Sequence, residues 1–139
     1  MTGRGLFLAV LTAAVLAAQD PAVVARDGWV RVPAPSKTET ALYVVLENHS
    51  AQRRKVVSVS TDAAATAEMH EMKMVRTTMI MTPVAEIAIP AKGKASLNPN
   101  GLHIMLFGLK ARPGVGDMIN VKLKLDDGSI VLVTATVRK

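Results

Sequence analysis

The sequence contains no cysteine, and this absence excludes several kinds of bond and site. Disulfides, thiolate metal centres and cysteine nucleophiles are unavailable, and a blue-copper electron carrier would need a cysteine thiolate beside its histidines. The 139 residues also offer no thiol for acylation by a lipid. Any metal chemistry must therefore use other donors, and an oxidising compartment could not inactivate them by forming disulfides.

Aromatic residues are nearly as scarce, at 3% of a chain that is 50% hydrophobic. Aliphatic and methionine side chains must therefore fill the interior. The length fits one domain, which we expect over residues 19–139. The aromatic residues are Phe7, Trp29, Tyr43 and Phe107.

Basic residues outnumber acidic ones, 17 to 11, which gives a formal net charge of +6. The basic residues are scattered apart from residues 53–55, and no aromatic platform or known nucleic-acid motif accompanies them. We therefore predict no nucleic acid binding. The charge is better explained by solubility and by steering toward an acidic partner or a membrane surface.

The first residues resemble a secretory signal. Arg4 precedes an apolar run over residues 6–18, and 13 residues are too few to span a bilayer comfortably. We expect a signal peptide over residues 1–18, cut after residue 17 or 18, and no stable membrane insertion afterwards. A retained anchor is the alternative. The mature protein is then expected outside the cytoplasm.

The remaining pattern predicts an all-β fold. Short runs of strand-forming residues alternate with turns, and no long helix is expected. Residues 63–68 have helix propensity, but His70, Met72 and Met74 share a face at a period of two, which favours a strand. We expect an antiparallel β-sandwich or Greek-key barrel, cupredoxin-like, with an irregular segment at 19–27. The expected strands cover residues 28–33, 40–47, 54–60, 65–73, 79–82, 85–89, 94–97, 103–107, 119–125 and 129–137.

Four residues form the most specific pattern in the chain. His70, Met81, His103 and Met105 read His-x10-Met-x21-His-x-Met. Two imidazoles and two thioethers make a neutral, partly soft ligand set, which suits Cu(I) better than zinc, iron, magnesium or calcium. On a strand, His103 and Met105 would share one face. The pattern therefore predicts a Cu(I) site.

Other residues near this motif have simpler interpretations. Methionine is a flexible gap filler, so core filling or hairpin packing is the first interpretation of Met69, Met72, Met74 and Met79. The alternative is a methionine-lined rim that passes copper along. Met72 shares a face with His70 and is the best candidate for an auxiliary donor. Glu68 and Glu71 both lie near enough to orient a histidine ligand. His49 is expected in a surface turn, and residues 126–128 (Asp-Asp-Gly) as a hairpin turn.

Residues 29–137 resemble the PCuAC family of periplasmic copper chaperones. Besides the four-residue motif, residues 99–106 (Pro-Asn-Gly-Leu-His-Ile-Met-Leu) are similar to the family signature Pro-Gly-Gly-x-His-x-Met-Leu. Asn100 replaces the first glycine, and because asparagine is the next most tolerant residue of positive φ, we expect the turn to survive. Residues 73–78 lack the glycine often found between the first two ligand strands.

The resemblance implies a function, which we state as an expectation. The protein would be a periplasmic, monomeric Cu(I) chaperone and not an enzyme, with no activated nucleophile or paired carboxylates in a plausible site. Its partner would be a copper-accepting oxidase subunit, in particular the dinuclear CuA site of cytochrome c oxidase, or another periplasmic copper protein. The alternatives are copper buffering or resistance without a dedicated acceptor, and an envelope scaffold to which the motif is irrelevant.

Overall fold

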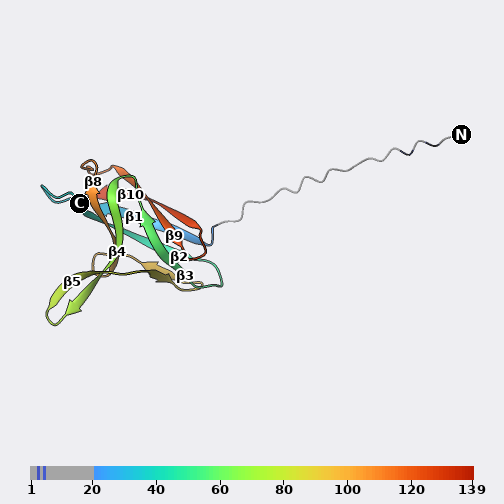
Figure 1. Ribbon diagram of the computed structural model, residues 1–139, viewed down its shortest axis with the longest axis horizontal. Coiled ribbons are helices and arrows are strands. Elements are labelled where there is room, and N and C mark those ends of the chain that lie inside the picture. Colours follow the sequence, from blue (N-terminus) through green and yellow to red (C-terminus); the bar gives the residue numbers. More distant parts are fainter. Residues whose placement is uncertain (1–2, 4, 6–20) are drawn as a thin grey trace.

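The computed structural model describes Gly3, Gly5 and residues 21–139, so the predicted signal peptide lies outside it apart from those two glycines. All regular elements in the described part are strands (Figure 1). None of its segments forms a helix that is long and apolar enough to cross a bilayer. The strands are β1 (Val23–Arg31), β2 (Thr40–Asn48), β3 (Arg54–Ser60), β4 (Ala64–Val75), β5 (Thr78–Pro83), β6 (Ile87–Ile89), β7 (Lys94–Ser96), β8 (Leu102–Leu109), β9 (Met118–Leu125) and β10 (Ile130–Arg138).

The strands form one continuous path in the order β5-β4-β8-β2-β1-β10-β9-β3-β6, with β7 paired to β2. The path folds back on itself, so that β3 lies against β4 and β6 against β7. This arrangement confirms the expected all-β sandwich, while the barrel alternative is wrong because the path has open ends at β5 and β6. The sheet is also mixed, because β1 and β10 pair in parallel.

The first strand begins earlier than expected. Residues 23–27, predicted to be irregular, belong to β1 and pair with β2. A bulge interrupts this pairing between Arg26 and Trp29, where Asp27 has a φ of 54°. A Cβ atom at Gly28 would lie 3.0 Å from Val133 Cγ1, so glycine lets the bulge approach this side chain of β10 closely. The Asp-Gly pair is therefore a bulge inside a strand, where the sequence resembled a strand start.

The main core lies between the two halves of the folded sheet. It is filled by aliphatic side chains, and several leucines and isoleucines have no exposed surface. Along β9 and most of β10, buried and exposed residues alternate strictly, as they do when only one face of a sheet meets the core. The largest fully buried members are Leu42, Leu46, Ile87, Ile89, Ile104, Leu106 and Leu123.

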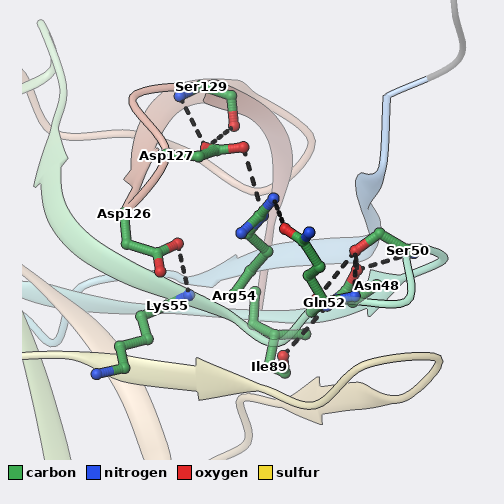
Figure 2. A network of polar contacts seen from close by, with 9 residues as sticks. All are labelled: Asn48, Ser50, Gln52, Arg54, Lys55, Ile89, Asp126, Asp127 and Ser129. Carbon is green, nitrogen blue, oxygen red and sulfur yellow. Dashed lines mark hydrogen bonds and ion pairs between the residues drawn. The ribbon is translucent and has the colours of Figure 1, made fainter.

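A polar network ties the loop after β2 to the β9–β10 hairpin (Figure 2). The Asn48 amide donates to the carbonyl oxygens of Gln52 and Ile89, at 2.8 and 3.3 Å. Arg54 donates to Gln52 Oε1 and lies 3.4 Å from Asp127 Oδ2. These contacts satisfy the buried Asn48 amide and fix the Asp-Gly hairpin, which confirms the predicted turn at residues 126–128.

Candidate metal centre

The two histidines of the motif lie directly opposite each other on neighbouring strands. His70 of β4 pairs with His103 of β8 in the antiparallel register, and their ring centroids are 6.0 Å apart. Directly opposed residues point to the same face of a sheet. Met105 follows His103 by two residues and therefore joins them on that face. Register alone thus gathers three of the four predicted donors.

This face is not the one that covers the main core. Ile104 and Leu106, which alternate with the donors on β8, are fully buried in the core. Met105 instead packs with Ala41 and Tyr43 in a second, smaller apolar cluster, against which Trp29 and Phe107 also pack. The candidate site therefore has its own apolar support on the outer face of the sheet.

One nitrogen of His70 is held by a carboxylate and the other has no partner. The Nε2 atom lies 2.8 Å from Glu68 Oε2, and a carboxylate accepts, so Nε2–H donates. The Nδ1 atom is buried and makes no hydrogen bond with any described residue. A buried, unpaired acceptor is costly unless something else occupies it. Of the two glutamates suggested by sequence, Glu68 makes this contact, while Glu71 lies on the opposite face of β4 by the period of the strand.

The ring of His103 is oriented by the backbone. Its Nδ1 atom lies 3.0 Å from the carbonyl oxygen of Gly101, and a carbonyl can only accept. Nδ1 therefore carries the hydrogen, which leaves the lone pair of a neutral ring on Nε2. The free lone pair is thus on Nδ1 of His70 and on Nε2 of His103. In each ring the hydrogen bond of the other nitrogen decides this, as is usual for metal-binding histidines.

The turn before β8 fixes the position of the Gly101 carbonyl that orients His103. The Gly101 carbonyl also accepts from the backbone N–H of Met72, at 3.1 Å. The side chain of Asn98 closes the turn by accepting from Asn100 N, at 3.1 Å. The turn survives with Asn100, as expected, although neither Asn100 nor Gly101 has positive φ. The turn tolerates a non-glycine residue because Asn98 supplies an Asx-type closure.

The motif residues border a cleft of about 360 Å³. Met81, His103 and Met105 line it, and Met72 joins them. His70 does not line this cleft, although its ring is close to that of His103. The structure therefore brings Met81, His103 and Met105 to one cavity and places His70 beside it.

Met81 is held least tightly of the four. It lies on β5 opposite Met72, and 45% of its surface is exposed. The β4–β5 hairpin that carries it projects from the rest of the sheet (Figure 1). Arg76 takes the positive φ, 57°, in its tight turn, which accounts for the missing glycine. The register places Met81 diagonally from His70, within reach of a long side chain.

The rim of the cleft is basic. Arg31 and Lys37 line it, with Glu39 as the acidic counterpart. The Arg31 guanidinium lies 5.9 Å from the centre of the Tyr43 ring. The donors themselves are neutral, so the positive rim disfavours a highly charged cation and leaves soft donor bonds to hold a metal.

The donor chemistry is that of a soft metal. The described residues contain no cluster of three or more His, Cys, Asp or Glu side chains able to hold a metal ion, such as zinc and iron sites use. Two imidazole nitrogens with thioether sulfurs suit Cu(I), which as a d10 ion accepts irregular geometry. The unpaired His70 Nδ1 is where such an ion would be expected.

The burial of the neighbouring methionines and of His49 can be compared with what the sequence predicted. Met69 is buried in the main core, as expected. Met74 and Met79 are 59% and 42% exposed, so core filling is wrong for them, while their pairing in the β4–β5 hairpin fits the other expectation, hairpin packing. His49 is exposed, as predicted. Sequence reasoning missed the role of the Gly101 carbonyl, for which no side-chain signal exists.

Comparisons with known proteins agree with this picture. The family described as "Putative lipoprotein LpqE-like" matches residues 23–137. The protein "Putative lipoprotein Lxx21020" of Leifsonia xyli subsp. xyli is 31% identical over 121 residues, covering 86% of this chain and 72% of the relative.

Solved structures add a match in three dimensions. The solution structure of CuI-DR1885 from Deinococcus radiodurans is 35% identical, with a TM-score of 0.65, over 88% of this chain and 82% of that one. The copper-bound PCuAC domain from PmoF2 has a TM-score of 0.71 over 85% and 93% of the two chains. At 18% identity, the second match shows the fold alone.

Proposed function

The chain belongs to the LpqE-like family, and from that premise we propose that it is a Cu(I) carrier whose ligands are His70, Met81, His103 and Met105. Copper is its cargo, and the site performs no catalysis. We place it in the periplasm after cleavage of a leader over residues 1–18. The residues from 19 onward would form one domain.

The observation that carries the proposal is the pair of opposed histidines. The Nδ1 atom of His70 is buried without a partner, while Glu68 and the Gly101 carbonyl fix the hydrogens of the two rings. These contacts prepare two nitrogen lone pairs for a cation. The relative DR1885, whose title names bound CuI, has the same fold at 35% identity, which supports copper as that cation.

The unequal burial of the donors suits a carrier. His70, His103 and Met105 are 8%, 3% and 7% exposed, whereas Met81 is 45% exposed. The three buried donors can retain the ion while Met81 detaches, because methionine has three flexible torsions and binds through one neutral sulfur. A ligand from an acceptor can then replace Met81 before the ion leaves. Transfer by ligand exchange needs no unfolding of the sheet.

A Cu(I) competition titration against a chromophoric chelator tests the ligand set. Met81→Leu and Met105→Leu remove a sulfur while nearly preserving volume, and His103→Asn removes an imidazole. Each is expected to weaken Cu(I) binding. Met118→Leu and His49→Asn are matched controls, because both residues are exposed and neither lines the cleft. Equal affinity in ligand and control variants, or no bound Cu(I) in the wild type, would reject the proposal.

The destination of the copper is a finer part of the proposal. We expect delivery as a monomer to the copper centre of a respiratory oxidase, the CuA site of cytochrome c oxidase, with buffering as the alternative. Deleting the gene separates the two. Loss of oxidase activity that added copper restores supports delivery, whereas copper sensitivity with normal oxidase activity supports buffering.

A further inference from the structure

One face of the projecting β4–β5 hairpin consists of methionines. Met72 pairs with Met81, and one step further out Met74 pairs with Met79. Paired residues share a face, and so do residues two apart on a strand, so all four side chains point to the same side. We call these four residues the methionine face. Over the paired residues 70–75 and 78–83, the opposite face of the hairpin, with Lys73 opposite Ile80, has no methionine.

Packing does not explain the outer pair. Met74 and Met79 are 59% and 42% exposed, and neither belongs to a core cluster. Threonine and other β-branched residues are favoured in strands, and a buried gap is the usual reason for methionine. The thioether side chains at these two positions therefore contribute little to packing.

The methionine face is continuous with the candidate metal centre. Its inner pair, Met72 and Met81, lines the cleft together with His103 and Met105. The outer pair lies the next same-face step along the strands, about 7 Å further out. Directly opposed residues on one face have Cβ atoms about 5 Å apart. One soft ion can therefore bridge the sulfurs of Met74 and Met79, with Met72 as a third donor.

From this arrangement we infer that Met74, Met79 and Met72 form a second site for a soft monovalent cation, outside the histidine site and weaker than it. Thioethers are selective for such ions, and the site has no imidazole to raise its affinity. The transfer role rests on the proposed function: an ion bound at the hairpin tip would move inward through Met72 and Met81, and outward by the reverse route. The binding itself is independent of that role.

The experiment is a titration with Ag(I), a soft monovalent d10 ion that needs no reductant, monitored by NMR of 13C-labelled methionine methyl groups. In the wild type, the Met81 and Met105 signals are expected to shift with the first equivalent. The Met74 and Met79 signals should shift with the second. The Met118 signal, from an exposed methionine on β9, should not move and serves as the internal reference.

Two variants separate the sites. In Met74→Leu/Met79→Leu the second equivalent should be lost and the first retained with unchanged affinity. In His70→Asn/His103→Asn the first should be lost, while the Met74 and Met79 signals still shift. Met74 and Met79 signals that stay fixed in both the wild type and the histidine variant would overturn the inference, and would leave the exposed hairpin as a protein-docking arm. Shifts of Met74 and Met79 without any response of Met81 and Met105 would instead contradict the proposed function.

Discussion

The carboxylate of Glu68 allows the candidate site to be tested without replacing a proposed ligand. Glu68 Oε2 accepts from His70 Nε2 at 2.8 Å, which holds the hydrogen on that nitrogen and the lone pair on Nδ1. Glu68→Gln keeps the shape of the side chain but removes its charge, so a neutral and weaker acceptor replaces the carboxylate that makes Nδ1 a stronger donor. We predict weaker Cu(I) binding in this variant.

The expected magnitude follows from similar contacts in other metal sites. Losing a partner of a histidine ligand typically weakens metal binding about 10- to 100-fold, which is about 1.4 to 2.7 kcal/mol. The cost to the metal-free protein should be smaller, below about 1 kcal/mol, because the Glu68 side chain is 52% exposed and surface pairs contribute little. The loss should therefore depend on copper.

Two measurements check this prediction. A chelator competition gives the Cu(I) affinity, and thermal unfolding at buffered free Cu(I) gives the copper-dependent stability. With free Cu(I) at about 100 times the wild-type Kd, copper stabilises the protein by about 2.7 kcal/mol, and a tenfold weaker variant by about 1.4 kcal/mol. That difference corresponds to about 5 °C in Tm for a domain of this size.

Glu71→Gln is the matched control. Glu71 lies on the same strand as Glu68, three residues further on, and its side chain is on the opposite face. It removes the same charge near the site without removing the contact to His70. The reasoning is refuted if both variants bind Cu(I) equally well. It is also refuted if Glu68→Gln lowers the Tm of the metal-free protein as much as that of the loaded protein.

Three further predictions concern the fold that carries the site. Arg76→Gly should raise the free energy of unfolding by about 1 kcal/mol in a denaturant titration, because glycine adopts the positive φ of 57° without steric cost. Gly108→Ala should lower it by at least about 1 kcal/mol, because Gly108 has a φ of 67° and a new Cβ would lie 2.9 Å from the Ala65 Cβ; an unchanged unfolding midpoint would contradict this. The Ser129 hydroxyl and N–H, followed by the charge of Arg54, lower the pKa of Asp127. A lowered pKa stabilises the fold above the ordinary Asp value and loses this effect as the pH falls, so Ser129→Ala should be less stable than wild type near neutral pH and approach it below about pH 3.8.

Most strands could be predicted because their residues record local burial. The predicted strand over residues 54–60 has the bounds of β3, although its burial does not alternate strictly, because a bulge between Val56 and Ser58 interrupts the pairing with β9. The methionine and histidine spacing of β4 outweighed the helix propensity of its alanines, because β4 pairs with β5 on one side and β8 on the other. Strand pairing is a tertiary constraint that overrides local propensity.

The first strand shows where local pattern fails. Asp27 and Gly28 have the composition of a turn, yet they form a bulge that the pairing of β1 with β2 continues across. The parallel pairing of β1 with β10 joins opposite ends of the chain, and alternation within either strand contains no information about it. Such contacts are decided by the packing of the whole sheet.

The candidate site was predictable in its donors and not in its register. Spacing selected His70 and His103, but their direct opposition depends on how β4 slides against β8. The choice between Glu68 and Glu71 could have been made from sequence, since only Glu68 shares the face of His70 at a period of two. The orienting carbonyl of Gly101 could not, because every residue has a carbonyl.

The position of the site on the outer face of the sheet bears on how a carrier can work. A structural metal site holds its fold together, so that removing the metal unfolds the protein. Here the fully buried aliphatic core lies on the other face, and contacts within the protein already orient both histidines. We therefore expect the fold not to depend on copper, so that the empty protein can bind it. Under the proposed function only Met81, on the projecting hairpin, would have to move between the empty and loaded states, which would limit the structural cost of each transfer.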